Sequence, residues 1–310
     1  MGAFVFPGQG SQAVGMGKAL ADASPAAREV FQEVDEALGQ HLFRLMCEGP
    51  ADELTLTENA QPAIMANAIA TRRGLEREGG VRLADKADYG AGHSLGEYTA
   101  LCAAGALDLS TTARLLKLRG QAMQAAVPVG EGAMAAILKL EFAQVAEIAG
   151  QAAGAKVCAV ANDNAPGQVV ISGHKAAVER ASDLVKAAGG RAMPLPVSAP
   201  FHCPLMAPAA EAMEAALGAA DLRSPLVPVF ANVTAAPAVD PAEIKRLLVE
   251  QVTGTVRWRE GVLAMQEAGV HHFAELGGKV LAPMIKRITP DAEAVSAVSM
   301  DEIEALAKGL

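Results

Sequence analysis

The stretch Ala87–Gly96, ADYGAGHSLG, decides the fold of this chain. Residues 87–92 predict a short strand, and a helical segment that ends near Gly105 follows it. Between the two lies Gly92-His-Ser-Leu-Gly96, a G-x-S-x-G motif. In a strand-turn-helix context this motif lifts the serine hydroxyl above the strand end and leaves helix N-terminal amides facing a developing oxyanion. We therefore expect Ser94 to be a nucleophile; the alternative is an ordinary serine N-cap.

Strands and helices alternate on both sides of this motif. An apolar strand is predicted at residues 3–6, and further strands are predicted at 227–233 and 270–276. Asp240 and Pro241 have the residue types that favour the N-cap and the first position of a helix. Such alternation predicts an α/β protein with a parallel sheet, and the G-x-S-x-G turn favours an α/β-hydrolase-like arrangement.

The middle of the chain has a different pattern. Residues 132–196 predict the order strand, helix, strand, strand, helix, strand, with a turn at 162–167 between the central strands. This order is the split βαβ of a ferredoxin-like unit. We expect residues 1–127 and 197–310 to form the large α/β-hydrolase-like domain, and residues 128–196 to form an inserted ferredoxin-like subdomain.

Composition excludes several classes of function. The chain has 310 residues, 51% of them hydrophobic, and a net charge of −9, so we expect no nucleic-acid partner. No apolar run is long enough to span a bilayer, and the start, MGAFVFPGQG, lacks the pattern of a signal peptide. The four cysteines match neither a disulfide framework nor a zinc site. We expect a reduced, cytoplasmic, monomeric enzyme without metal or cofactor.

A nucleophilic serine needs a base, and His202 is the best candidate. It lies in a proline-containing loop, Ser198–His202, where the inserted unit returns to the main sheet. Loops at such junctions commonly carry catalytic groups. The side chain of His93 is one residue from Ser94 and should diverge from it. The other histidines are interpreted as structural or solvated, with one ring of the adjacent pair in the core: His41, His174, His271 and His272.

Arg119 occupies an unusual place in the predicted helix 111–126. At about 100° per residue, it falls on the apolar arc that includes Leu115, Leu116, Leu118 and Met123. An unpaired buried charge costs several kcal/mol, so Arg119 needs an internal acidic partner or a bound anionic ligand. Its planar guanidinium suits bidentate binding of a carboxylate.

The glycine-rich turn Pro7–Ser11 follows the first strand. Its sequence has neither a G-x-G-x-x-G in register nor the lysine of a P-loop, so we do not expect it to hold a phosphate. A second oxyanion amide from this turn is better supported, because hydrolase-like sites take one N–H from such a loop.

Several motifs together resemble one family, the malonyl-CoA:acyl carrier protein transacylases of fatty acid synthesis and the related acyltransferase domains of polyketide synthases. The resemblance covers essentially the whole chain. The motifs are FPGQGSQ at 6–12, QPA at 61–63, GHSLGEY at 92–98, LRGQAM at 118–123, NDN at 162–164, PFH at 200–202 and VEQ at 249–251.

The resemblance implies a role for each of eight residues. Ser94 is the acyl-accepting nucleophile and His202 its base, the amides of Gln9 and Leu95 form the oxyanion hole, Arg119 binds the malonyl carboxylate, the Gln251 carbonyl orients His202, and His93 and Asn162 line the site. The implied partners are malonyl-CoA and holo acyl carrier protein, with a malonyl-serine intermediate and ping-pong kinetics. The candidate docking cations are Lys117, Lys279, Lys286 and Arg287.

Three alternatives stay open. A serine thioesterase or esterase could use Ser94 with Asp240 and His272, in the chain order of a hydrolase triad. A binding module could keep the fold without turnover. A stand-alone acyltransferase of a polyketide synthase or a malonate decarboxylase would share the donor and the site.

Overall fold

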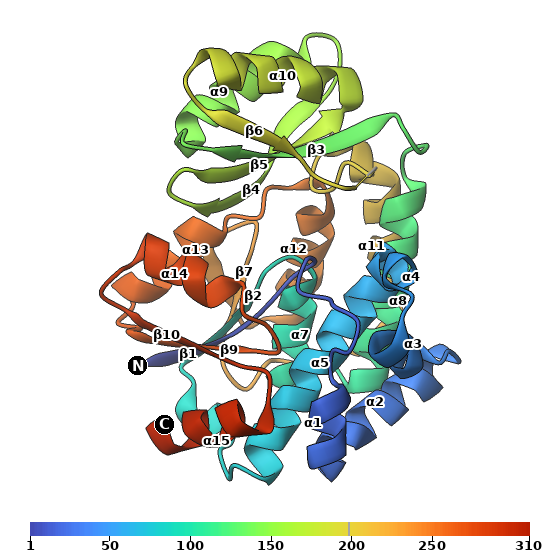
Figure 1. The fold of residues 1–310 in the computed structure, drawn as a ribbon, viewed down its shortest axis with the longest axis vertical. Helices are drawn as coiled ribbons and strands as arrows, with labels where there is room; N and C mark the ends of the chain where they lie inside the picture. Colours follow the sequence, from blue (N-terminus) through green and yellow to red (C-terminus); the bar gives the residue numbers. More distant parts are fainter. Residues whose placement is uncertain (198) are drawn as a thin grey trace.

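The computed structural model describes residues 1–197 and 199–310, and its larger sheet runs through the lower half of the view in Figure 1. The strand order is β10-β9-β1-β2-β7-β8, and all neighbours are parallel except β7 and β8. The predicted α/β fold with a mainly parallel sheet is confirmed. The strands are β1 (Gly2–Phe6), β2 (Tyr89–Gly92), β7 (Val229–Ala231), β8 (Ala236–Ala238), β9 (His272–Leu276) and β10 (Glu293–Ala297).

Helices cover both faces of this sheet. Alternation in β1 sends Phe4 and Phe6 into the core under one set of helices, and Ala3 and Val5 against α13 and α14 on the other face. None of the helices in the described residues is both long and apolar enough to cross a membrane. The helices are α1 (Lys18–Ala23), α2 (Pro25–Leu38), α3 (Leu42–Glu48), α4 (Ala51–Thr55), α5 (Thr57–Arg77), α6 (Leu83–Lys86), α7 (Leu95–Ala103), α8 (Leu109–Ala125), α11 (Ala207–Ala219), α12 (Pro241–Thr253), α13 (Trp258–Glu267), α14 (Leu281–Ile288) and α15 (Met300–Gly309), with a 3₁₀ turn at Pro204–Met206.

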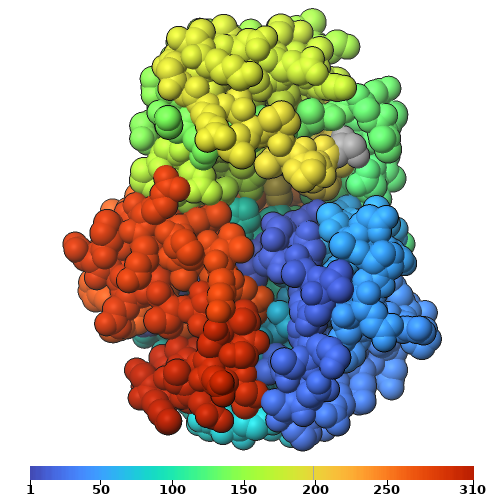
Figure 2. Space-filling model, in the orientation of Figure 1, coloured from blue at the N-terminus to red at the C-terminus, as the bar shows by residue number. Residues whose placement is uncertain are grey.

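A second, antiparallel sheet has the order β4-β5-β3-β6 and carries α9 and α10. In Figure 2 this green-to-yellow unit meets both the blue N-terminal and the red C-terminal parts of the chain. The predicted turn at 162–167 is wrong at its start, because β4 continues through Asn162 and Asp163, which pair with β5. The elements are β3 (Gly132–Leu138), α9 (Phe142–Ala153), β4 (Cys158–Ala165), β5 (Gln168–His174), α10 (Lys175–Ala187) and β6 (Arg191–Pro194).

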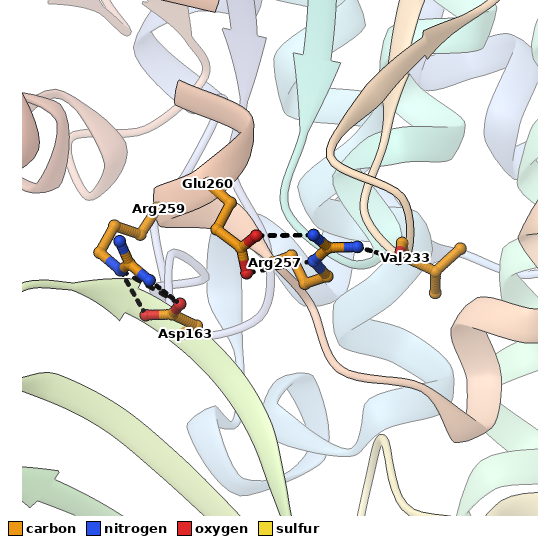
Figure 3. A network of polar contacts seen from close by, with 5 residues as sticks. All are labelled: Asp163, Val233, Arg257, Arg259 and Glu260. Carbon is orange, nitrogen blue, oxygen red and sulfur yellow. Dashed lines mark hydrogen bonds and ion pairs between the residues drawn. The ribbon is translucent and has the colours of Figure 1, made fainter. Parts of the chain in front are cut away.

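The outer edge of β4 is attached to the segment before α13. The Asp163 amide donates to the Val256 carbonyl at 2.9 Å, and the Val256 amide donates to the Ala161 carbonyl at 2.8 Å. The fully buried Asp163 carboxylate also accepts from Arg259, with a closest distance of 2.8 Å (Figure 3). Burial raises the pKa of Asp163, and the Arg259 guanidinium opposes that shift. These contacts fix the second sheet against the first.

The Asp163–Arg259 pair should contribute measurably to stability. We expect Asp163→Asn to lower the free energy of unfolding by about 2 kcal/mol, because it removes the charge partner of a partly buried guanidinium. The matched control is Glu250→Gln, which breaks the exposed pair with Arg246 and should cost no more than about 0.5 kcal/mol. Urea unfolding of the two variants measures the difference, and equal losses would show that the buried pair does not stabilise the junction.

Candidate active site

The turn from β2 into α7 is built by close backbone approach. A Cβ added at Gly92 would lie 1.8 Å from the Gly96 carbonyl oxygen, and one added at Gly96 would lie 2.3 Å from the Phe6 carbonyl oxygen. Glycine is therefore required at both positions. The turn holds Ser94, the residue before α7, at φ 55° and ψ −111°. This is a strained conformation for a residue with a side chain.

Ser94 and His202 form a hydrogen-bonded pair. Ser94 Oγ lies 2.7 Å from His202 Nε2, and His202 Nδ1 lies 2.8 Å from the Gln251 backbone oxygen. Because a carbonyl only accepts, Nδ1 carries the proton and Nε2 is left to accept the Ser94 hydroxyl proton. His202 itself has φ 55°. Ser198, where its predicted loop begins, lies outside the described residues.

The surroundings keep His202 neutral. Burial, and next the positive charge of Arg119, lower its pKa to about 3. The imidazole of the free protein is therefore an unprotonated base over the whole physiological pH range.

Arg119 meets this pair from α8. It is 1% exposed, and its Nη2 donates to Ser94 Oγ at 3.1 Å and to Gln251 Oε1 at 2.7 Å. Its Nη1 donates to Gln61 Oε1 at 2.8 Å. In the described part of the chain these partners are all neutral oxygens, and Nε has no hydrogen-bond partner. The predicted burial is correct, but no acidic side chain of the described residues forms an ion pair with Arg119; the buried Glu97 interacts with it electrostatically without a direct contact. One residue that was predicted to lie on the buried apolar arc, Leu118, is instead 36% exposed.

The two predicted oxyanion amides lie in the turn after β1 and at the start of α7. Among the described residues, neither the Gln9 nor the Leu95 amide donates to another protein oxygen, so both are available to a ligand. The Gln9 side chain accepts from Thr57 Oγ1 at 3.0 Å, and Thr57 Oγ1 in turn accepts from Gln61 Nε2 at 2.9 Å. Hydrogen bonds thus link the turn after β1 to Gln61, which also accepts from Arg119.

A cavity of about 300 Å³ opens over Ser94 between the two sheets. Arg119, His202, Gln9, Leu95, His93 and Asn162 all line it, so the structure brings these predicted residues together. The turn after a strand of the larger sheet supplies Ser94, and the unit of the second sheet supplies an apolar wall that includes Met134, Val170 and Leu195. His93 Nε2 lies 2.7 Å from Asn164 Oδ1, a residue to which the sequence assigned no role.

A larger cavity of about 610 Å³ lies at the opposite end of the sheet. Residues at the amino ends of β1 and β9 line it, whereas Ser94 follows the carboxyl end of β2. Ligands of parallel sheets bind at the carboxyl ends of the strands, so the smaller cavity is the functional one.

The residues of the hydrolase alternative are not brought together. His272 begins β9 and pairs with Glu293 at 2.8 Å, and Asp240 accepts from the Glu243 amide as the N-cap of α12. The prediction that one ring of the His271–His272 pair points into the core is wrong, since both residues are exposed. Sequence reasoning also assigned no role to Gln61, although its QPA motif contributed to the resemblance.

Comparison with known proteins shows the family of this chain. Residues 3–296 match the family model described as acyl transferase domain. This chain belongs to that family. It is 45% identical over 310 residues to the malonyl CoA-acyl carrier protein transacylase of Escherichia coli K12, covering 99% of this chain and 98% of the relative. The enzyme of the same name from Bacillus subtilis is 44% identical, covering 97% and 95%.

Solved structures share the whole fold of this acyltransferase. An acyl-carrier-protein S-malonyltransferase from Bartonella henselae superposes with a TM-score of 0.97 at 51% identity, covering 100% of this chain and 99% of the other. A malonyl-transacylase solved in complex with a type II polyketide synthase acyl carrier protein has a TM-score of 0.96 at 40% identity, covering 100% and 99%.

The low pKa of His202 predicts an unusual pH profile for the reaction of Ser94. The rate of labelling by a neutral fluorophosphonate should stay nearly constant from about pH 8 to about pH 5, because His202 remains an unprotonated base there. A base with the ordinary histidine pKa of about 6.5 would lose about 30-fold over that range. Quenched samples analysed by intact mass give the rate, His202→Ala gives the background, and circular dichroism checks folding. A midpoint near the ordinary value would contradict the assigned environment.

Proposed function

We propose that this protein transfers the malonyl group of malonyl-CoA to the phosphopantetheine thiol of holo acyl carrier protein, for fatty acid synthesis. One observation carries the proposal: the Ser94 oxygen is in contact with both a neutral histidine and a buried arginine that has no ion-pair partner among the described residues. A nucleophile, its base and a site for a carboxylate thus meet at one atom. Relatives along the whole chain carry the name of this activity.

In the first half-reaction, Ser94 Oγ attacks the thioester carbonyl carbon and gives its proton to His202 Nε2. The carbonyl oxygen becomes an oxyanion that accepts from the Gln9 and Leu95 amides. The tetrahedral intermediate collapses, the carbon–sulfur bond breaks, and the CoA sulfur leaves with the proton from His202. A malonyl ester of Ser94 results.

In the second half-reaction, the phosphopantetheine thiol gives its proton to His202 and its sulfur attacks the ester carbonyl. The carbon–oxygen bond to Ser94 breaks, and His202 returns the proton to Ser94 Oγ. Because one site serves first the donor, malonyl-CoA, and then the acceptor, the carrier-protein thiol, the kinetics are ping-pong.

Arg119 selects the donor through charge. Acylation places positive charge on His202, and Arg119 already contacts the same serine oxygen. A malonyl carboxylate bound to Arg119 balances the two cations, whereas an acetyl group leaves them opposed in a buried site. The carboxylate therefore assists the chemical step as well as binding, and acetyl-CoA is a poor donor.

The proposed site lies between two parts of the chain. We infer an α/β-hydrolase-like domain of residues 1–127 and 197–310 and an inserted ferredoxin-like subdomain of residues 128–196. The order β4-β5-β3-β6 with two helices supports the second part.

Of the candidate docking cations, Lys117 pairs with Glu58 and Lys279 pairs with Glu302. The exposed Lys286 and Arg287 on α14 are therefore the better candidates for carrier-protein docking.

A second function rests on one specific comparison. The neighbour in complex with a polyketide synthase carrier protein has nearly the same fold, so service to a polyketide synthase is the second candidate. It uses the same donor and the same residues, and only the carrier protein differs.

The proposed function predicts a malonyl adduct on Ser94 that holo acyl carrier protein removes. Brief exposure to malonyl-CoA should add one malonyl group to Ser94, and holo acyl carrier protein should remove it with formation of malonyl carrier protein, both seen by intact mass. His202→Ala should abolish the adduct, because no other base contacts Ser94 among the described residues. Loss of the adduct to water at the same rate with or without carrier protein would indicate a thioesterase instead. A folded protein that never forms the adduct would favour a binding module.

Arg119→Ala should narrow or invert the preference for malonyl over acetyl donors. We expect kcat/KM for malonyl-CoA to fall by about 100-fold or more, since a charge-assisted pair is lost, while acetyl transfer stays the same or rises. Arg114→Ala, an exposed arginine on the same helix, is the control and should leave the preference unchanged. Undiminished malonyl transfer by the Arg119 variant would refute its role.

A further inference from the structure

Asn232 lies beside the nucleophile turn although it is far from it in sequence. It directly follows β7, which pairs in parallel with β2 through Gly90 with Val229 and Ala91 with Phe230. Parallel neighbours end at the same edge of a sheet, so the residue after β7 meets the residues after β2. Asn232 is 4% exposed, and it does not line the cavity over Ser94.

The side-chain amide of Asn232 is engaged on both sides. Its Oδ1 accepts from the Ser94 backbone amide at 2.8 Å and from Gln251 Nε2 at 3.1 Å. Its Nδ2 donates to the Gly92 carbonyl at 2.8 Å. The Asn232 side chain therefore bonds to two residues of the turn, Gly92 and Ser94, and also to Gln251, whose backbone oxygen accepts from His202.

These bonds hold both members of the catalytic pair. The Ser94 peptide is bonded at its N–H by Asn232 and at its carbonyl by Gln251 Nε2, at 3.0 Å, which keeps Ser94 at positive φ. The Gln251 backbone oxygen in turn holds His202 Nδ1. Loss of the Asn232 side chain would remove one hydrogen bond each from the Ser94 amide, the Gly92 carbonyl and the Gln251 side chain, and would leave Gln251 bonded to Arg119 and the Ser94 carbonyl.

Asn232 is itself held firmly. Its backbone amide donates to the carboxyl group of Glu97, whose pKa burial raises to about 8, and its carbonyl accepts from the Arg257 amide at 3.0 Å. The Arg257 guanidinium donates to the Val233 carbonyl at 3.1 Å and pairs with Glu260 at 2.6 Å (Figure 3). The loop that carries Asn232 is thus a rigid support for the turn.

We propose that Asn232 is a positioning residue whose side-chain amide holds the Ser94 peptide and Gln251, so that Ser94 Oγ and His202 Nε2 remain at hydrogen-bonding distance. This inference rests on the proposed roles of Ser94 and His202. Because Asn232 lies outside the cavity, its removal should lower kcat and leave KM for malonyl-CoA little changed.

The first test compares two buried asparagines. Asn232→Ala should slow fluorophosphonate labelling of Ser94 by about 100-fold, the usual consequence of a displaced reacting group. It should lower kcat with malonyl-CoA by a similar factor, with KM within about threefold. The control is Asn59→Ala: Asn59 is 5% exposed, and it too makes three hydrogen bonds, with Gln40, Lys117 and Glu53. Its labelling rate should stay within about twofold of wild type.

The second variant, Asn232→Asp, gives a readout that a structural role alone would not produce. A protonated carboxyl can accept from the Ser94 amide and donate to the Gly92 carbonyl, whereas an ionised one cannot donate. The labelling rate of this variant, divided by the wild-type rate, should therefore be near one at low pH and fall at least tenfold as the introduced carboxyl ionises. This variant decides the question if Asn232→Ala does not fold.

The outcomes separate the two hypotheses. Labelling does not use malonyl-CoA, so a wild-type protein that labels at Ser94 but forms no malonyl adduct would refute the proposed function and still allow the Asn232 comparison. Labelling of Asn232→Ala within threefold of wild type would overturn the positioning role. So would a pH-independent ratio for Asn232→Asp, or a wild-type Ser94 that is not labelled at all.

Discussion

The hydrogen bond between Ser94 Oγ and His202 Nε2 depends on a backbone turn that leaves no room for a side chain next to it. Gly92 and Gly96 bring the start of α7 against the carbonyl of Phe6, and this contact sets Ser94 at the carboxyl edge of the sheet. Ser94 and His202 are both held at positive φ. Such strain persists only where surrounding bonds over-determine the backbone, and here those bonds come from β1, β7 and α12.

The second constraint is the buried charge of Arg119. Among the described residues its guanidinium has no ion pair, which is costly in a protein interior. The amides of Gln61 and Gln251 and the ring of Tyr98, whose centroid lies 5.6 Å away, offset only part of that cost. The same positive charge lowers the pKa of His202, so the free site is poorly suited to develop an imidazolium ion. In the proposed reaction, a substrate carboxylate would relieve both penalties at once. Under that proposal, selectivity and catalysis both follow from the buried charge of Arg119.

Features set by near neighbours in the chain could be read from the sequence. The strand-turn-helix at 87–96, the Asp240 cap and the apolar strand at 3–6 depend on local residue types, and the structure has each of them. The end of β4 could not be read in this way. Residues 162–165, NDNA, favour a turn, but pairing with β5 and with Val256 outweighs that preference. Likewise, nothing local shows that both His271 and His272 are exposed.

The site shows the same division. Ser94 and Arg119 stand out in the sequence because a motif and a charge on an apolar arc are local signals, and His202 stands out by its loop. Asn232 gives no such signal, since a lone asparagine after a strand is common in turns. Its importance arises only when β7 lies beside β2, which brings together residues 138 positions apart. Once a sequence predicts the strand that carries a nucleophile, the residues that follow the neighbouring strands are the places to look for groups that position it.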